Sequence, residues 1–403
     1  MNRFSSAVSR GIARVTEAAL GPYQTAVIRI GFSATWLLFL LRELPHRHEL
    51  YGPDGPWSWN LAEQLIGANG AFTVLMWSDG RIWFEIVYAF AVLASALLML
   101  GWRTRTMSVL FMVGVLSLQN RSVFMGDGGD NVLHLMSVYL LFTRCAQVWS
   151  LDARRASRAR AAHERGRRVT DRTGPVLWCL LGFVLVAVTL AGRMEGEKLI
   201  PGLLWTVWVA QALWWLAGRR VRSGEPRILL DVVANIVHNG ALLVIMAEAC
   251  LIYATAGWYK IQGSRWQDGT AVYYPLHLEY FSPWPGLADL LSSSGTLVML
   301  VTYGTVLVQV AFPFTLFNRR VKNVLLAVMI TEHAVIAVVL GLPFFSLAMI
   351  AADAVFLPTS FLRRLGGWSA RARDRLPRRG GRTPVTERHA DEDPEVTHVG
   401  FGT

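Results

Sequence analysis

The sequence predicts an all-α polytopic membrane protein: a transmembrane helical bundle of about ten spans with both termini cytoplasmic. Hydrophobic residues make up 53% of the 403 positions and fall in blocks of roughly 18 to 25 residues, the length a helix needs to cross a bilayer. Arginine-rich segments separate alternate blocks. We expect a cytoplasmic N-terminal segment at 1–23, a transmembrane domain at 24–362, and a disordered basic and then acidic cytoplasmic tail at 363–403.

Ten apolar blocks are the predicted spans. They lie at approximately 24–43, 82–100, 105–122, 131–149, 174–192, 201–218, 229–257, 296–316, 323–341 and 344–361. Short cytoplasmic loops carry an excess of Arg and Lys. The segment before the first block and the loops after the second, fourth, sixth and eighth blocks are the basic ones. This alternation places the loops at 44–81, 125–131 and 258–295 outside.

The net charge of +11 does not predict a nucleic-acid partner, because the arginines form short clusters between apolar blocks rather than one folded surface. The lipid bilayer is the expected partner. Cys145, Cys179 and Cys250 are odd in number and lack metal-type spacing, so we expect no metal site and treat them as apolar fillers. The P-loop, His-Glu-x-x-His and Gly-x-Ser-x-Gly motifs of soluble enzymes are missing.

Lys260 is the first candidate for chemistry. Only 3 of the 39 basic residues are lysines, and this one ends the seventh block. A partly desolvated lysine can act as a base, whereas arginine stays charged. The alternative is an interfacial lysine that extends towards lipid headgroups. The nearby aromatic residues suit either the membrane interface or a planar lipid-soluble ligand such as a quinone, and the expected cofactor-binding residues are Trp258, Tyr259, Trp266, Tyr273 and Tyr274.

Ionisable residues inside spans are costly, and they either pair structurally or line a pathway. The expected intramembrane polar residues are Glu85, His134, Glu248, Glu332 and Asp353, together with His333. His333 and Asp353 lie ten residues before and after Pro343, which turns the last hairpin. Each is therefore about 15 Å from that turn at about 1.5 Å per residue. We expect the two at the same depth, where they are able to touch, as a structural lock or as part of a proton pathway.

The turn Gly126-Asp-Gly-Gly-Asp-Asn131 joins the third and fourth blocks. In the structural interpretation the glycines supply left-handed backbone angles, and Asp130 and Asn131 cap the next helix. In the functional interpretation Asp127 and Asp130 present carboxylates at the mouth of the bundle as a cation site or proton relay. Two acids without further oxygen ligands are weak support for calcium.

These segments resemble the HTTM group, bacterial membrane proteins related to vitamin K-dependent gamma-carboxylase. The resemblance is carried by Gly126–Asn131, Ala256–Thr270, and Glu332-His333 ahead of Gly341–Ser346. It covers about 25–360, with 174–227 as an additional helix pair. It implies a reduced quinone of the menaquinone or vitamin K type as cofactor, deprotonated by Lys260, which with Gly257 matches the carboxylases' Gly-x-x-Lys.

Two features depart from the carboxylases. Asn131 stands near the place of a histidine, and their large luminal domain has no counterpart, so protein carboxylation is not implied. SdpB-like relatives imply a different role, in the maturation or export of a small secreted peptide.

Three functions therefore stay open for this multi-pass protein of the cell membrane. The first is a quinone-dependent or carboxylase-like enzyme whose outward-facing site uses Lys260 as base, with Asp127, Asp130 and His333 as further catalytic residues. The second is a non-catalytic partner of a small secreted peptide. The third is a proton-coupled transporter that uses Glu248, His333 and Asp353.

Overall fold

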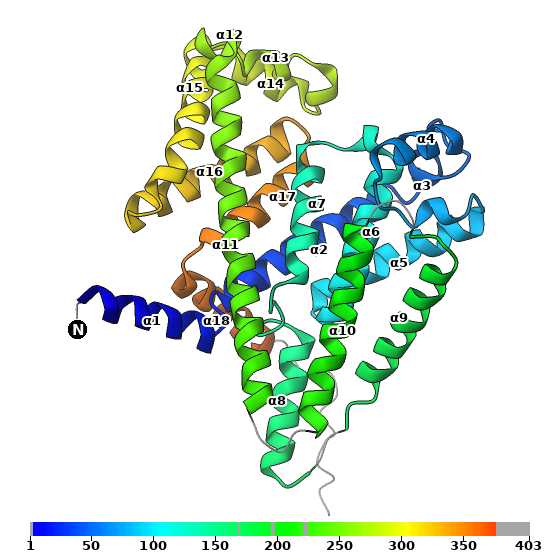
Figure 1. The fold of residues 1–403 in the computed structure, drawn as a ribbon. Coiled ribbons are helices and arrows are strands. Elements are labelled where there is room, and N and C mark those ends of the chain that lie inside the picture. Colours follow the sequence, from blue (N-terminus) through cyan, green and yellow to red (C-terminus); the bar gives the residue numbers. More distant parts are fainter. Residues whose placement is uncertain (1–2, 168–169, 195–197, 221–224, 376–403) are drawn as a thin grey trace, which may run out of the picture. The chain divides into compact units, whose positions relative to one another are not determined.

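The computed structural model describes residues 3–167, 170–194, 198–220 and 225–375 (Figure 1). All regular elements in these ranges are helices, which confirms the all-α fold class for this part of the chain. The longer helices are α1 Arg3–Glu17, α2 Pro22–Arg42, α5 Arg81–Leu100, α6 Thr104–Arg121, α7 Gly128–Leu141, α8 Leu151–Glu164, α9 Thr173–Leu190, α10 Leu199–Arg220, α11 Glu225–Gln262, α15 Gly295–Ala311, α16 Arg319–Val339, α17 Pro343–Asp353 and α18 Thr359–Arg375.

Short helices fill the connections. They are α3 Arg47–Tyr51, α4 Trp59–Asn69, α12 Ser264–Gln267, α13 Tyr273–Leu276 and α14 Pro285–Ser292, with 3-10 turns η1 Leu75–Trp77, η2 Val123–Met125, η3 Glu279–Phe281, η4 Phe312–Thr315 and η5 Ala354–Phe356. Residues 1–362 form one unit and residues 363–403 a second.

Seven described helices are long and apolar enough to cross a membrane: α2, α5, α9, α10, α11, α15 with η4, and α16. Every predicted span overlaps a helix, but α6, α7 and α17 do not by themselves meet the same criteria of length and hydropathy. The count of ten spans and the cytoplasmic placement of both termini stay predictions.

Two predicted spans and the tail differ from expectation. The span expected at 131–149 ends at Leu141, because the segment after it turns back towards α2. The span expected at 344–361 leaves the α-helix after Asp353 and enters η5 ahead of Pro358. The tail expected to be disordered from 363 begins as part of α18, whose Arg, Leu and Ala residues favour helix. The remainder of the tail lies outside the described residues.

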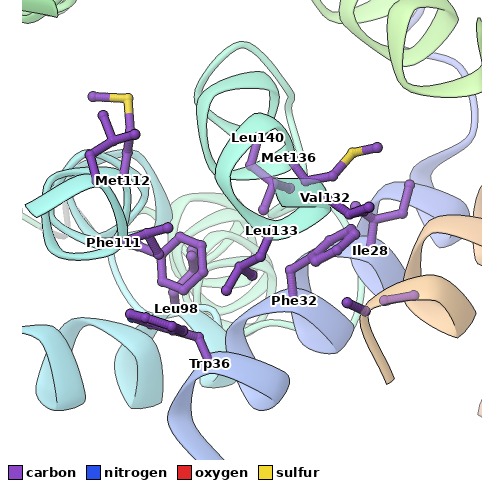
Figure 2. Close-up of a cluster of buried hydrophobic side chains, with 14 of the residues drawn as sticks. Ile28, Phe32, Trp36, Leu98, Phe111, Met112, Val132, Leu133, Met136 and Leu140 are labelled. Carbon is purple, nitrogen blue, oxygen red and sulfur yellow. The ribbon is translucent and has the colours of Figure 1, made fainter. Parts of the chain in front are cut away.

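Helices α2, α5, α6 and α7 build a large part of the core (Figure 2), which continues into α11, α16 and α17. Ile28, Phe32 and Trp36 recur every four residues on α2 and are at most 1% exposed. They belong to one cluster with buried residues of the three other helices, Leu98, Phe111, Met112, Val132, Leu133, Met136 and Leu140. α17 packs on α2 through Gly31, where an added Cβ would come within 2.5 Å of the Ala351 Cβ. Such small residues allow the close helix contacts that hold transmembrane bundles together.

Arg29 explains the early end of α7. Its guanidinium is fully buried and donates to four backbone carbonyls, those of Leu98 and Met99 at the end of α5 and of Cys145 and Trp149 after α7. Backbone carbonyls buried without a donor are costly. Arg29 therefore stabilises a non-helical connection at one end of the bundle.

Candidate functional site

Lys260 lies in the last turn of α11, and the amide of Gln309 connects its amine to Glu332. Lys260 Nζ donates to Gln309 Oε1 at 2.5 Å, and Gln309 Nε2 donates to Glu332 Oε1 at 2.9 Å. Gln309 is 5% exposed. Within the described part of the chain, no carboxylate forms an ion pair with Lys260. The amine is therefore bonded to a neutral group, which stabilises its charged form less than a carboxylate would.

The contact between Lys260 and Gln309 depends on a close approach of α11 to α15. Gly257 lies three residues before Lys260, and an added Cβ there would come within 2.6 Å of the Val310 Cγ2. Because Gly257 lacks a side chain, the backbones approach closely at this level. The Gly-x-x-Lys spacing thus has a local structural consequence: the glycine brings α15 within reach of the lysine.

The aromatic residues expected to bind a cofactor differ in their contacts: Trp266 faces this amine, whereas Tyr273 stacks on His277. The Trp266 ring centroid is 5.2 Å from Lys260 Nζ, within the range of a cation–π contact. Trp258 and Tyr259 are 63% and 75% exposed. Tyr273 and Tyr274 are more than 40% exposed and lie edge to face in α13. Trp266 is thus the aromatic residue of this group that contacts the amine.

Tyr253 joins His333 to Asp353 in a buried cluster between α11, α16 and α17. The Tyr253 hydroxyl lies 2.9 Å from both Asp353 carboxylate oxygens and 3.1 Å from His333 Nε2. All three residues are at most 3% exposed. The hydroxyl donates to Asp353, so His333 Nε2 carries the proton that the hydroxyl oxygen accepts. This leaves His333 Nδ1 as a buried acceptor without a partner among the described residues.

The acidic turn caps α7, but not as the sequence suggested. Asp127, rather than Asp130 or Asn131, is the N-cap: its Oδ1 accepts from the backbone N–H groups of Gly129 and Asp130. Asp130 completes a capping box by accepting from the Asp127 N–H. None of the glycines in this turn has a positive φ, so the expected left-handed angles are wrong. The helix begins two residues earlier than Asp130, and Gly128 and Gly129 are helical.

Asp130 is linked to His134 through Gln119 of α6. Gln119 Nε2 donates to the Asp130 carboxylate at 3.3 Å, and Gln119 Oε1 lies 3.1 Å from His134 Nδ1. The direction of the amide makes His134 Nδ1 the donor. Burial raises the pKa of Asp130 to about 6, despite the opposing hydrogen bonds. An amide therefore separates acid from base here, as Gln309 does between Glu332 and Lys260.

The other predicted polar residues lie apart from these clusters. Glu85 is 40% exposed and pairs with Arg47 and His48 of α3, each at 2.8 Å. Glu248 is partly buried on α11 and interacts electrostatically with Tyr139 of α7. The structure shows no hydrogen bond between Glu248 and His333 or Asp353 among the described residues. Glu85 is thus a surface ion pair that fixes α3 to α5.

A cavity of about 250 Å³ opens between α2, α7 and α17. Its wall contains Asp127, Asp130 and Arg42, and six aromatic residues complete much of the lining: Trp36, Phe39, Phe124, Tyr280, Phe344 and Phe345. Residues of two of the three loops that were expected to share the outer face, 125–131 and 258–295, line this cavity, together with Arg42 at the end of α2. Phe345 also packs edge-on against His333, with ring centroids 5.6 Å apart. The buried cluster therefore lies behind the cavity wall, whereas Lys260 does not line the cavity.

The sequence analysis did not identify three residues that matter for these clusters: Tyr253, Gln119 and Gln309. Tyr253, Gly257 and Lys260 follow the i, i+4, i+7 spacing of one helix face, which could have identified Tyr253. Gln119 and Gln309 are amides inside otherwise apolar blocks, a feature typical of interhelical hydrogen bonding. Within the described residues, no group of three or more His, Cys, Asp or Glu could hold a metal ion.

No family model, curated protein or solved structure matches the chain. Its class follows from fold and composition: it is an all-α protein whose apolar helices have the length of membrane spans. The motifs around Asp127, Lys260 and His333 carry the proposed relation to the HTTM group.

Proposed function

We propose that the protein is a quinone-dependent enzyme of the cell membrane, of the HTTM or gamma-carboxylase-like type, in which Lys260 is the base. The observation that carries this proposal is the partly buried amine, bonded to the neutral amide of Gln309 and faced by the Trp266 ring. A lysine without a carboxylate partner can give up its proton and accept another. Base catalysis by a positioned side chain contributes about 10²–10⁴-fold to a rate.

The residues around Lys260 fit a planar lipid-soluble ring. Trp266 offers an aromatic face next to the amine, and the exposed Trp258 and Tyr259 flank it on the same helix end. A bound hydroquinone would supply an acidic ring hydroxyl. In this arrangement Lys260 accepts the proton, Gln309 orients the amine through its carbonyl oxygen, and Glu332 fixes the direction of the Gln309 amide.

The experiment is a mass-spectrometric analysis of small molecules retained by protein purified gently into lipid nanodiscs. The proposal predicts a prenylated quinone in near-stoichiometric amount, and less of it in Trp266→Ala than in the wild type. Trp284→Ala is the matched control, because Trp284 is 60% exposed and has no contact with Lys260. A quinone content no higher than that of the surrounding lipid would overturn the proposal.

A second function, proton-coupled transport, is supported by the buried Tyr253–His333–Asp353 cluster. Ionisable groups at such depth are typical of proton pathways as well as of structural locks. Proteoliposomes with a trapped pH-sensitive dye would report proton uptake driven by an imposed gradient. Transport predicts uptake that Asp353→Asn abolishes, whereas equal leakage in both proteins and in empty vesicles would rule this function out.

A further inference from the structure

α1 carries two chemically different faces. Arg10 and Arg14 are one turn apart on one face, and Val8, Ile12 and Val15 recur at the i, i+4, i+7 positions of another. At about 100° per residue, Ile12 projects roughly 160° away from Arg10. Val8 and Ile12 are 44% and 60% exposed, so the described residues leave this part of the apolar face uncovered.

The C-terminal end of α1 is fixed to α11 by a polar stripe. Asn235 donates to the Thr16 carbonyl, Asn239 donates to the carbonyls of Val15 and Ala18, and His238 Nε2 lies 2.8 Å from the Leu20 carbonyl. Asn239 Oδ1 also accepts from the Leu20 N–H at 2.8 Å. The stripe satisfies carbonyls that the helix end would leave without partners. α1 is therefore held at a defined level of α11.

The position and charge of α1 identify what covers its apolar face. α2, which is apolar and long enough to cross a membrane, begins at Pro22, five residues after α1 ends. A basic amphipathic helix next to a span is typical of a helix that lies in the membrane interface. We propose that α1 lies in the bilayer surface, with Val8 and Ile12 among the acyl chains and Arg10 and Arg14 at anionic lipid headgroups.

This proposal determines which part of α11 lies in the bilayer. α11 has 38 residues and is about 57 Å long, almost twice the roughly 30 Å hydrocarbon core. His238, at the level of α1, precedes Lys260 by 22 residues, or about 33 Å of helix. With α1 at one interface, Lys260 lies at the opposite interface, and the first turns of α11 extend beyond the acyl chains. The stripe on α11 thus sets the membrane depth of the candidate base.

The test is spin-label accessibility on the full chain in nanodiscs, in a background with Cys145, Cys179 and Cys250 replaced by Ala. Spin labels are attached to the cysteines of Ile12→Cys and Arg10→Cys. Ser157→Cys, on the polar helix α8, is the control for a position exposed to water. The proposal predicts that the Ile12 label collides mainly with oxygen, which concentrates in acyl chains. The labels at positions 10 and 157 should collide mainly with a water-soluble nickel complex.

A change in lipid composition tests whether Arg10 and Arg14 bind anionic headgroups. Replacing a third of the phosphatidylcholine by phosphatidylglycerol should increase the ratio of buried to water-exposed Ile12 label, by up to about fivefold for each arginine that contacts an anionic surface. Arg10→Gln with Arg14→Gln should remove that increase and leave the label at position 157 unchanged. Equal access of the nickel complex to positions 12 and 10 would overturn the interfacial placement. An unchanged buried fraction with phosphatidylglycerol would overturn the anionic partner.

Discussion

Replacing Tyr253 by Phe removes one oxygen from the buried cluster and should destabilise the protein. The hydroxyl is the only described hydrogen-bond partner of the Asp353 carboxyl and of His333 Nε2, and Asp353 is fully buried. A buried polar group that loses its partner costs about 1–3 kcal/mol, and more if it is charged. We expect Tyr253→Phe to lower the free energy of unfolding by about 1–3 kcal/mol, and the apparent unfolding midpoint by about 1–4 °C for a chain of this length.

The assay is intrinsic-fluorescence unfolding in nanodiscs at a fixed heating rate, because membrane proteins often unfold irreversibly. Tyr259→Phe is the matched control: it lies on the same helix, is 75% exposed and should unfold with the wild type. A cycle of Tyr253→Phe with Asp353→Asn should give a coupling energy between about 0.5 and 3 kcal/mol. Equal midpoints for Tyr253→Phe and Tyr259→Phe would refute the reasoning.

Three further results are expected. Gly257→Ala should lower the free energy of unfolding by about 1–3 kcal/mol, because the added methyl group overpacks against Val310. Gly240→Ala is the control, because Gly240 lies on the same helix with open space around it. Similar losses in the two variants would contradict the close approach of α11 to α15. Arg29→Met should cost about 3–5 kcal/mol in unfolding assays, since the carbonyls of Met99, Cys145 and Trp149 lose their side-chain donor, and a cost below about 1 kcal/mol would be inconsistent with that role. Because burial raises the pKa of Asp130 from 3.8 to about 6, the folded state binds a proton in that window that the unfolded chain releases. Stability should therefore fall as pH rises from about 4 to about 6, by at most about 3 kcal/mol, and Asp130→Asn should remove this dependence when unfolding is followed from about pH 3.5 to 7.5.

The helix positions could be predicted from the sequence because each predicted span is a continuous block of apolar residues. Each of the ten blocks overlaps a helix, as expected for segments whose backbone must satisfy its own hydrogen bonds in lipid. The early end of α7 could not be predicted in the same way. Its determinant, Arg29, is more than a hundred residues away in sequence, and its partners are backbone carbonyls that no side-chain pattern reveals.

Most individual residues of the candidate site could be predicted from the sequence, but the contacts that join them could not. The depth argument placed His333 and Asp353 near each other, and the structure joins them through Tyr253. Lys260 and Glu332 were each singled out, but their connection through Gln309 depends on how α15 packs between their helices. The capping role of Asp127 was missed because the helix start was set by hydrophobicity, which begins after the polar first turn.

The most direct test of the account is hydroquinone oxidation by the protein in nanodiscs under air, with Lys260→Arg and Lys260→Met compared to the wild type. Lys322→Arg is the matched control, since Lys322 bonds only the Phe356 carbonyl in the described structure. We predict that the wild type and Lys322→Arg consume a menaquinol or vitamin K hydroquinone at equal rates, and that both Lys260 variants are slower by at least about 100-fold. Full turnover by Lys260→Arg, whose guanidinium cannot act as the base, would contradict the account.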